Sequence, residues 1–538
     1  MKYPPTPDHT GETRGAPPMP QITQFLRRAL QVNPTGTATI CQDRSRTWTM
    51  FAARAARLAG ALTDLGLQPG DRIGILSLNS DRYLESFFGL AWAGIVFVPI
   101  NTRLAPPEIV FWLTDSGCTG LLIDDMFAPT LTTILPQTPD LRHIIHFGDQ
   151  PAPEGISSYE TLIANGRPIA DAGRRGQDLA GIFYTGGTTG RSKGVMLSHA
   201  NILANAQNIQ PATPIDSRTR FIHAAPMFHL ADGAMTFLVT AFGGTHTFLP
   251  RFDPAAFLQT VEQHGVTTAL IVPTMINMLV HHPEVTKRDL SSLRGFIYGA
   301  SPMPEALIRR AMEVMAHVQF TQAYGQSEAS PVMTLMPPEY HTFDGPFAGR
   351  MKSAGRAALG CELRILDEDD NEVPPHTVGE ICGRGPMVML GYWKQPELTA
   401  HTLRNGWLHT GDGGYLDEEG FLYIVDRMKD MIVSGGENVY SAEVEEALYA
   451  HPAVAECAVI GVPDETWGER VHAVVRLKPG TSATDRDLIA ACHTRIANYK
   501  CPRSVTIQPD PLPMSGAGKI LKAELRRPYW QGLEKRVN

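Results

Sequence analysis

Residues 179–194 read LAGIFYTGGTTGRSKG, a short apolar segment followed at once by a run of glycines, threonines, a serine and a lysine. The apolar part, 179–183, predicts a buried strand because it is short and continuous. Glycine lets the backbone approach a ligand closely. Successive backbone N–H groups, hydroxyls and an ammonium group are suited to binding a polyphosphate. The segment therefore predicts a strand that leads into a phosphate-binding loop of a nucleotide site.

This loop differs from the Walker P-loop, which ends in Gly-Lys-[Ser/Thr] and places a hydroxyl on magnesium. Here two residues separate Gly190 from Lys193, and Gly194 follows the lysine. The later pair Gly518-Lys519 is followed by Ile520 and does not fit the motif either. A mobile surface connection is the alternative interpretation, since Gly/Thr/Ser clusters are typical of loops. The position directly after a predicted strand favours the phosphate site.

Outward from this loop, short apolar runs alternate with helical patterns. Helices are expected at 50–65, 83–93, 107–114, 230–242, 254–264, 274–281 and 304–317. Strands are expected at 72–78, 120–123, 143–147, 221–224, 246–248, 269–272 and 295–298. Such alternation predicts an α/β fold with layered, mainly parallel sheets.

The pattern changes near residue 363, where short strands and turns predict a small β-rich subdomain up to 423. Beyond the charged segment 426–430 we expect a compact α+β unit. Its helices are predicted at 441–449, at 485–497 and near Leu521, and its strands at 456–462 and 472–477. We therefore predict a large N-terminal domain, 1–428, and a small mobile C-terminal domain, 429–538.

Composition limits the class of protein. A chain of 538 residues is too long for one ordinary core, and 43% hydrophobic with 19% charged residues fits a soluble globular enzyme. A net charge of −8 argues against nucleic-acid binding. Seven cysteines without a C-x-x-C pair suggest free thiols in a reducing compartment. The longest apolar run, 87–100, is shorter than the ~20 residues of a membrane span. We expect a cytoplasmic protein.

Further clusters of chemically active residues follow at wide spacing. They are Tyr324-Gly325-Gln326-Ser327-Glu328, Thr410-Gly411-Asp412, Ser434-Gly435-Gly436-Glu437-Asn438 and Ser515-Gly516-Ala517-Gly518-Lys519. Taken singly, each is a weak signal, because an acid after glycine is usually a turn residue and a lysine on a loop is usually solvated.

Together and in this order, these segments resemble the adenylate-forming family of acyl-CoA synthetases, luciferases and peptide-synthetase adenylation domains. The resemblance covers about residues 47–525. The loop is similar to the family's Tyr-Thr-Ser-Gly-Thr-Thr-Gly-x-Pro-Lys-Gly, with Gly187 in place of the serine and Ser192 in place of the proline. Further resembling pieces are Pro226-Met227-Phe228-His229, Tyr298-Gly299-Ala300-Ser301, Gly379-Glu380, Gly391-Tyr392 and Asp426-Arg427.

The resemblance implies an AMP-forming acid–CoA ligase that uses ATP, Mg²⁺ and, as co-substrate, coenzyme A. The acid and ATP would form an acyl-adenylate and pyrophosphate, and the acyl group would pass to coenzyme A. Nucleotide-binding residues implied in this way are Thr185, Gly186, Gly187, Thr188, Thr189, Gly190, Lys193, Gly299, Ala300, Ser301, Tyr324, Gly325, Ser327, Asp412 and Arg427. Glu328 and Thr188 would hold magnesium, and Lys519 would bridge the carboxylate and the α-phosphate.

The resemblance also implies an acid pocket and a hinge. The pocket would be lined by His229, Ala231, Met235, Gly325, Pro331 and Val332, with His229 orienting the carboxylate as a third catalytic residue. These side chains are small or apolar apart from His229, so the pocket suits an uncharged tail. Lys429 matches the hinge position, and Ser434, Gly435 and Gly436 match the coenzyme A side.

Several alternatives stay open. A medium- or long-chain fatty acid is the first choice of substrate, and an aryl acid of the coumarate or benzoate type is the second. Nineteen residues follow Lys519, too few for a fused carrier domain, although a separate carrier protein remains an alternative acceptor. A luciferase-like enzyme and a nucleotide-binding pseudoenzyme are further alternatives. A homodimer also stays open.

Overall fold

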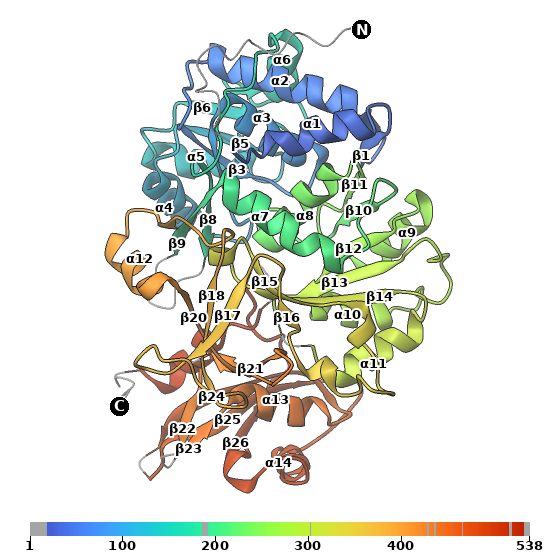
Figure 1. Ribbon diagram of the computed structural model, residues 1–538, viewed down its shortest axis with the longest axis vertical. Coiled ribbons are helices and arrows are strands. Elements are labelled where there is room, and N and C mark those ends of the chain that lie inside the picture. The colour runs from blue at the N-terminus through green and yellow to red at the C-terminus, as the bar shows by residue number, and fades with distance from the viewer. Residues whose placement is uncertain are drawn as a thin grey trace.

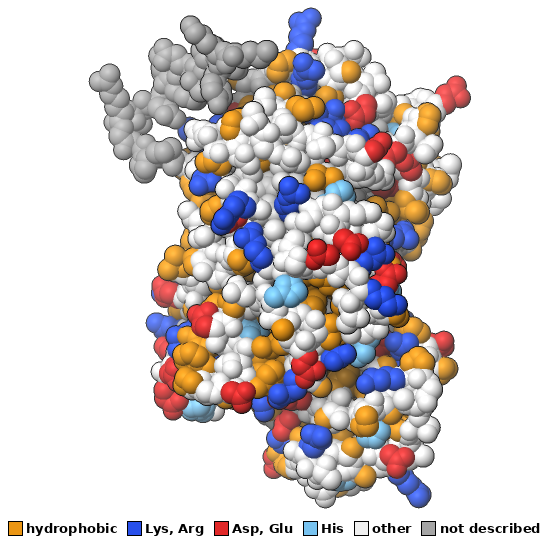
Figure 2. Space-filling view, turned by 90° about the vertical axis from the view of Figure 1, so that its right-hand side faces the viewer, with side chains coloured by type: hydrophobic (Ala, Val, Ile, Leu, Met, Phe, Trp, Pro, Cys, Tyr) orange, Lys and Arg blue, Asp and Glu red, His pale blue; other side chains and the backbone are white. Residues whose placement is uncertain are grey.

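The computed structural model describes residues 19–185, 192–301, 303–427, 430–434, 437–464, 466–515 and 519–531, without the side chains of Arg427 and Asn438. Within this part of the chain, the strands form four sheets. Figure 1 shows the N-terminal elements at the top and the C-terminal elements at the bottom of the long axis. In Figure 2 the outline narrows above the lowest part, which forms a separate smaller lobe. The fold is α/β, with a large N-terminal and a small C-terminal domain.

The first sheet contains the strand that precedes the predicted phosphate loop. Its order is β19-β9-β8-β4-β3-β5-β6-β7. These strands are β3 (Arg72–Leu76), β4 (Val96–Pro99), β5 (Gly120–Ile123), β6 (His143–His146), β7 (Ser157–Ser158), β8 (Leu179–Thr185), β9 (Lys193–Ser198) and β19 (Gly391–Tyr392). Pairing is parallel from β8 to β7 and antiparallel at β9 and β19.

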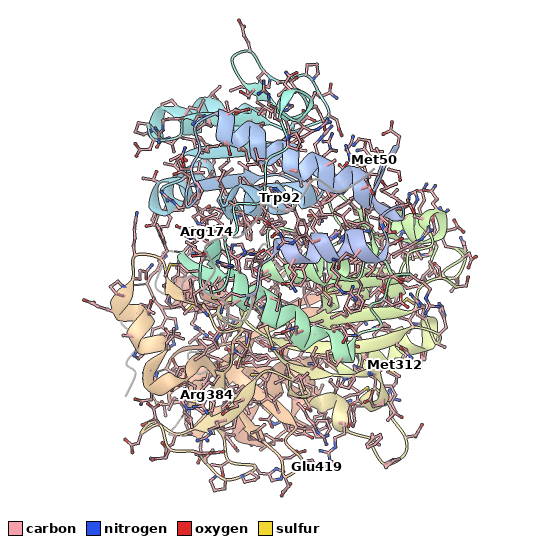
Figure 3. All side chains as sticks on the ribbon, turned by 45° about the horizontal axis from the view of Figure 1, so that its top comes forward. Met50, Trp92, Arg174, Met312, Arg384 and Glu419 are labelled. Atoms are coloured by element: carbon pink, nitrogen blue, oxygen red, sulfur yellow. The ribbon has the colours of Figure 1, made fainter. Side chains whose placement is uncertain are left out.

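Helices accompany this sheet in Figure 1. They are α2 (Trp48–Asp64), α3 (Asp81–Ala93), α4 (Pro106–Ser116), α5 (Leu131–Ile134) and α6 (Tyr159–Asn165). Nearly every residue of α3 is buried, which places this helix inside the domain. Figure 3 shows side chains filling the space between the layers; Trp92 of α3 donates its Nε1–H to the Ile169 carbonyl at 2.9 Å.

The second sheet has the order β16-β15-β14-β13-β12-β10-β11-β1-β2. Its strands are β1 (Thr37–Cys41), β2 (Arg44–Thr47), β10 (Arg220–His223), β11 (Thr245–Phe248), β12 (Thr268–Ile271), β13 (Gly295–Gly299), β14 (Gln319–Gly325), β15 (Val332–Met336) and β16 (Arg356–Ala357). Pairing is parallel from β1 to β14, and the strands beyond them pair antiparallel. In parallel sheets of this kind, ligands bind at the carboxyl ends of the strands.

The helices that belong to this sheet are α1 (Thr23–Val32), α7 (His199–Ile209), α8 (Leu230–Ala241), α9 (Pro254–His264), α10 (Pro273–Val280) and α11 (Glu305–Val314). Helix α8 is buried along almost its whole length, and α1 and α7 pack against it. The helical pattern predicted at 230–242 is therefore explained by burial on all sides.

The third sheet is antiparallel and consists of β17 (Glu362–Leu366), β18 (Gly379–Arg384), β20 (Leu408–Leu416) and β21 (Leu422–Arg427). The short helix α12 (Pro396–Thr402) lies between β19 and β20 in sequence. Figure 3 labels Arg384 of β18 and Glu419, which precedes β21. This sheet is the β-rich subdomain predicted from the turn-rich sequence.

The fourth sheet forms the C-terminal lobe. It contains β22 (Ile432–Ser434), β23 (Glu437–Val439), β24 (Val454–Asp464), β25 (Gly468–Leu477) and β26 (Ser504–Ile507). Its helices are α13 (Ser441–Tyr449), α14 (Asp485–His493) and α15 (Lys522–Arg526). A separate apolar cluster around Val459, Val471 and Leu488 gives this lobe its own core.

Most predicted elements are confirmed within a few residues, and β5, α9 and α13 have the predicted bounds. Helix α14 ends at His493, four residues before the predicted 497, and Ala497 itself has non-helical angles of φ −59° and ψ 143°. Helix α1 and the hairpin of β1 and β2 were not predicted. All seven cysteines are free and buried. No helix among the described residues is long and apolar enough to cross a bilayer.

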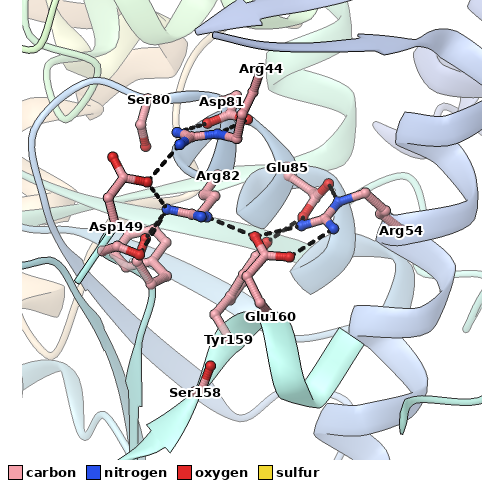
Figure 4. Close-up of polar contacts among 12 residues, drawn as sticks. Arg44, Arg54, Ser80, Asp81, Arg82, Glu85, Asp149, Ser158, Tyr159 and Glu160 are labelled. Carbon is pink, nitrogen blue, oxygen red and sulfur yellow. Dashed lines mark hydrogen bonds and ion pairs between the residues drawn. The ribbon is translucent and has the colours of Figure 1, made fainter. Parts of the chain in front are cut away.

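An ion-pair network fixes the beginning of α3 against its neighbours (Figure 4). Asp81, with a side chain 1% exposed, pairs with Arg46 and with Arg44, the latter at 3.0 Å. Glu85, equally buried, accepts from Arg54 at 2.6 Å. Burial alone would raise the pKa of Glu160, but hydrogen bonds from Arg54 and Arg82 lower it to about 2. The two buried carboxylates, Asp81 and Glu85, are tolerated because each has an arginine partner.

Candidate active site

The predicted phosphate loop connects two antiparallel strands. Thr185 at the end of β8 pairs with Lys193 at the start of β9. A Walker loop instead leads from a strand into a helix. The predicted residues Gly186, Gly187, Thr188, Thr189 and Gly190 lie outside the described residues. Lys193 lies over the ring of Tyr392, with its Nζ 5.3 Å from the ring centroid, so the lysine is directed toward β19.

Glu328 is a buried carboxylate that interacts electrostatically with Lys193 and Lys519. It follows β14, and Tyr392 donates its hydroxyl to Glu328 Oε1 at 2.8 Å. The backbone is also fixed, since Met389 N–H bonds to the Glu328 carbonyl at 2.8 Å. Burial raises the pKa of the carboxyl, while the Tyr392 hydrogen bond and the charges of Lys193 and Lys519 oppose the rise. A cation is therefore favourable beside this carboxylate.

Tyr324 and Asp412 meet although they are far apart in sequence. The Tyr324 hydroxyl donates to Asp412 Oδ2 at 2.8 Å. In the backbone register of the β20–β21 ladder, Asp412 lies opposite Arg427. The turn before Asp412 is supported by Glu380, whose Oε1 accepts the Gly411 N–H at 2.9 Å. The third sheet thus carries an acidic residue to the carboxyl end of β14.

The support around Glu380 involves more side chains than the sequence suggests. In the described part of the chain, Glu380, Cys382 and His409 bring their potential metal-ligand atoms within 4.8 Å of one another. Arg404 already donates to Glu380 Oε2 at 3.3 Å. Burial raises the pKa of the Cys382 thiol, which disfavours the thiolate. We interpret this cluster as support for the turn at Gly411.

The segment Gly299-Ala300-Ser301 lies at the carboxyl end of β13, beside β14. A Cβ on Gly299 would lie 2.1 Å from the carbonyl oxygen of Ala323, so only glycine fits there. Ala300 then adopts a positive φ of 66°. This conformation is costly for alanine and is typical of ligand-binding sites. These three predicted nucleotide-binding residues therefore border the same strand edge as Tyr324.

His229 caps the N-terminus of α8. Its Nδ1 accepts the Ala231 N–H at 3.3 Å. Burial, followed by the charge of Lys519, lowers the pKa of His229 to about 4. The ring is therefore neutral at pH 7, and because Nδ1 accepts, the proton lies on Nε2. His229 is suited to donate one hydrogen bond to a carboxylate.

The remaining predicted pocket residues come from two segments. Ala231 and Met235 lie on α8, and Met235 is fully buried. Pro331 and Val332 precede or begin β15, opposite the end of β14. A Cβ on Gly325 would lie 1.9 Å from the Pro331 carbonyl oxygen, so the glycine allows these two strands to approach closely. Ser327, in the turn after Gly325, lies beside Glu328.

Lys519 connects the C-terminal lobe to this site. Its charge acts on both His229 and Glu328. The described residues on either side of positions 516–518 are bonded to each other, since Ser515 N–H donates to the Lys519 carbonyl at 2.7 Å. Arg103 of the large domain donates to the Ser515 carbonyl at 2.8 Å. The segment that leads to Lys519 therefore contacts the loop between β4 and α4 of the large domain.

Three predicted residues of the hinge and coenzyme A side, Lys429, Gly435 and Gly436, lie outside the described residues. Ser434 ends β22 and is buried in the C-terminal sheet. Sequence reasoning missed the part played by Tyr392, Arg103 and Glu380. Gly379-Glu380 and Gly391-Tyr392 belong to the resembling segments, whereas the contact of Arg103 with Ser515 spans 412 residues of sequence and cannot be predicted from spacing.

Comparisons with known proteins give matches to one enzyme family over most of the chain. The family model for AMP-binding enzymes matches residues 26–393, and the model for the AMP-binding enzyme C-terminal domain matches 443–519. A feruloyl-CoA synthase from Amycolatopsis sp is 40% identical, covering 94% of this chain and 98% of the relative.

Two further similarities involve other acids. The long-chain-fatty-acid–CoA ligase FadD13 of Mycobacterium tuberculosis is 35% identical, covering 95% of this chain and 99% of the relative. The crystal structure of the anthranilate CoA ligase AuaEII with anthranoyl-AMP superposes with a TM-score of 0.87 at 28% identity, covering 96% of this chain and 98% of that one.

Proposed function

This chain belongs to the family of AMP-binding enzymes and is an AMP-forming acid–thiol ligase that uses ATP, Mg²⁺ and coenzyme A, and we propose that its acid is a medium- or long-chain fatty acid. The observation that supports the choice of site is that the charge of Lys519 acts on both His229 and Glu328. An ammonium group therefore interacts electrostatically with a neutral imidazole and with a carboxylate at the carboxyl edge of the second sheet.

The chemistry explains why these groups are needed. A carboxylate has a poor leaving group, so it must first become a mixed anhydride with AMP. Its oxygen attacks the α-phosphorus while pyrophosphate departs, which brings two anions together. Lys519 stabilises the charge that develops at this point, and His229 orients the carboxylate through Nε2–H. In the proposal, Thr185, Lys193 and the loop between them hold the leaving pyrophosphate.

The donor set near Glu328 fits a hard divalent cation. Magnesium prefers oxygen ligands and bridges phosphates, and Glu328 offers a buried carboxylate beside the predicted phosphate loop. When bound there, Mg²⁺ would neutralise phosphate charge. Thr188 is the second proposed ligand. We further propose that Asp412 binds the ribose hydroxyls and that Gly299, Ala300, Ser301 and Tyr324 face adenine.

The second half-reaction requires a different arrangement. The thiol of coenzyme A attacks the acyl carbon and AMP leaves, so Lys519 has to withdraw from the acyl side. We propose that the C-terminal domain, 429–538, rotates about Lys429 and brings Ser434, Gly435 and Gly436 to the thiol. The small lobe with its own core supports this role, because it can move as one unit.

The tail of the acid is the least constrained feature. Met235 and Val332 are apolar, and Ala231 and Pro331 are small, so the proposed lining offers no partner for a second charge. This supports a fatty acid. An aryl acid is the second candidate, because feruloyl-CoA synthase at 40% identity and anthranilate CoA ligase are among the similar proteins.

The test is pyrophosphate release by the purified protein with ATP and Mg²⁺. A panel of straight-chain acids from four to eighteen carbons and of cinnamic and benzoic acids is assayed with and without coenzyme A. We expect release with the longer straight chains, and acyl-CoA only when the thiol is present. Selective release with aryl acids would replace the fatty acid by the second candidate. No release with any acid would favour the pseudoenzyme.

A further inference from the structure

Two backbone segments form the proposed acid pocket, and each is held from outside by a buried asparagine. The first segment, 224–229, joins β10 to α8 and ends at His229. The second contains Pro331 and Val332 before and at the start of β15. Asn79 contacts the first segment, and Asn205 contacts the second. Neither asparagine is among the proposed lining residues.

Asn79 uses both polar atoms of its carboxamide, the Nδ2 donor and the Oδ1 acceptor, to hold the first segment and the residue before it. Its Nδ2 donates to the His223 carbonyl at 3.1 Å and to the Ala225 carbonyl at 2.8 Å. Its Oδ1 accepts the Met227 N–H at 2.8 Å. Because the side chain is only 6% exposed, water does not compete strongly for these groups. Three backbone groups immediately before His229 are thereby fixed in position.

Asn79 is itself firmly placed. It follows β3 in the first sheet, where the Asp124 carboxylate accepts Ser77 Oγ–H at 3.0 Å and Leu78 N–H at 2.8 Å. After Asn79, the chain enters the ion-pair network at Asp81 (Figure 4). The carboxamide therefore links the carboxyl edge of the first sheet to the pocket segment that leaves the second sheet.

The ends of the first segment are also tied to each other. His223 Nδ1 lies 2.6 Å from Asp232 Oδ2, and both side chains are completely buried. His223 precedes the segment and Asp232 lies in the first turn of α8. With both ends joined, the Asn79 contacts determine the conformation of the residues between them.

Asn205 holds the opposite segment in a simpler way. It lies on α7, is 1% exposed, and its Oδ1 accepts the Val332 N–H at 3.0 Å. Next to it, Ser330 donates its hydroxyl to the Met387 carbonyl at 2.7 Å. The position of Pro331 relative to α8 is thus set by a helix that contributes no residue to the proposed lining.

We propose that Asn79 and Asn205 are positioning residues that determine the distance between the two walls of the acid pocket, and through it which acids are activated. The proposal rests on the proposed function, because it assumes that His229 and Pro331 border the acid. It extends specificity to residues that touch neither acid nor nucleotide.

Asn208 provides a matched control on the same helix. It is 3% exposed, and its Oδ1 accepts the N–H of Gly360 at 2.8 Å, a residue of the segment before β17. Replacement by leucine at 79, 205 or 208 removes the hydrogen bonds and leaves nearly the same volume. All three variants should lose stability, but only two should alter acid recognition.

The experiment measures KM for the best acid of the wild type and KM for ATP by pyrophosphate release. Asn79→Leu and Asn205→Leu should raise KM for the acid by about tenfold or more and change the order of preference among acids, with KM for ATP within about twofold. Asn208→Leu should leave both values within about twofold. If a leucine variant does not fold, the serine variant at the same position replaces it.

Aspartate variants distinguish the loss of an accepted hydrogen bond from the loss of donated hydrogen bonds. Asn205→Asp keeps the oxygen that accepts from Val332 and should restore the KM for the acid. Asn79→Asp keeps one contact but loses the two donated ones, so it should remain impaired. Equal effects of the three leucine variants on the acid, or a matching rise in KM for ATP, would overturn the proposal. A wild type that activates no acid would instead reject the proposed function.

Discussion

A single ammonium group, that of Lys519, influences two residues with opposite requirements. It helps keep His229 neutral, and it works against the rise in the pKa of Glu328 that burial causes. A neutral donor and an ionised carboxylate can thus coexist in a partly desolvated site. Loss of this charge should therefore slow the adenylation step, in which we propose that both groups act.

We predict that Lys519→Ala lowers the rate of acyl-adenylate formation by about 100-fold or more, since one preorganised donor is lost from the transition state. Thioester formation from supplied acyl-AMP should remain largely intact. Both steps are measured separately, the first as pyrophosphate release and the second as acyl-CoA formation. Lys352→Ala, at an exposed position, is the control. Equal losses in both steps would contradict the assigned role.

For the hydrogen-bonded pair Tyr324 and Asp412 we predict rises in KM for ATP of two different sizes. Asp412→Ala should raise KM for ATP by about tenfold or more, because a charged acceptor of hydrogen bonds is removed. Tyr324→Phe removes the hydroxyl that donates to Asp412 at 2.8 Å but keeps the carboxylate, so it should give a smaller rise. Tyr415→Phe on the same strand is the control. An unchanged KM for ATP in Asp412→Ala would argue against ribose binding.

At the scale of elements, local patterns predicted the strands and helices well. Strands such as β5 and β13 are short apolar runs between turns, and α9 and α13 have clear helical spacing. The β1–β2 hairpin was missed because β2, Arg44–Thr47, contains no residue that reads as apolar. Its arginines face Asp81 and complete the ion-pair network, a tertiary requirement that local propensity does not report.

In the site, too, local sequence motifs could be predicted and tertiary contacts could not. The resemblance named Glu328, Asp412 and Lys519, whose motifs are local in sequence. Contacts that join distant segments, such as Tyr392 with Glu328 or Asn79 with Met227, could not be predicted from spacing, because only the folded chain brings them together. The roles assigned to all of these site residues remain predictions, and residues 186–190, 429, 435 and 436 also lie outside the described residues.

The contact between Arg103 and Ser515, close to Lys519 in sequence, gives a prediction about one element. Arg103→Ala removes the 2.8 Å hydrogen bond to the Ser515 carbonyl. The contact is exposed, so we expect a loss of about twofold to tenfold in acyl-adenylate formation. Thioester formation from supplied acyl-AMP should not fall. Arg142→Ala, on an exposed part of the same domain, is the control. A slower second step with an unchanged first step would contradict the docking role.

At the scale of the molecule, several histidines are buried in a neutral form. Burial lowers the pKa of His199, His341 and His472 to about 4 in each case. Between that pKa and the usual value of 6.5, the unfolded chain binds more protons than the folded one. The stability that each neutral histidine provides is therefore present above pH 6.5 and is lost as the pH falls toward 4.

We predict that His341→Gln reduces this pH dependence. Glutamine can replace the contacts of His341 with the Tyr298 hydroxyl at 3.0 Å and the Pro337 carbonyl at 3.2 Å, but it does not titrate. The advantage of the wild type over the variant in free energy of unfolding should shrink from pH 7 to pH 5, by about 1.4 kcal/mol per pKa unit at most. Urea unfolding at both pH values measures it. A constant difference would contradict the prediction.

Helix α7 has a consequence for how this chain tolerates changes of length. Asn201, Asn205 and Asn208 project from one face, and they bond to Pro386 and Val388, to Val332 and to Gly360. One residue inserted between Asn201 and Asn205 would rotate the later two by about 100° away from their partners. The contacts with all of these segments depend on the spacing of the three asparagines along α7. Insertions and deletions should therefore be tolerated in the connecting loops and not in this helix.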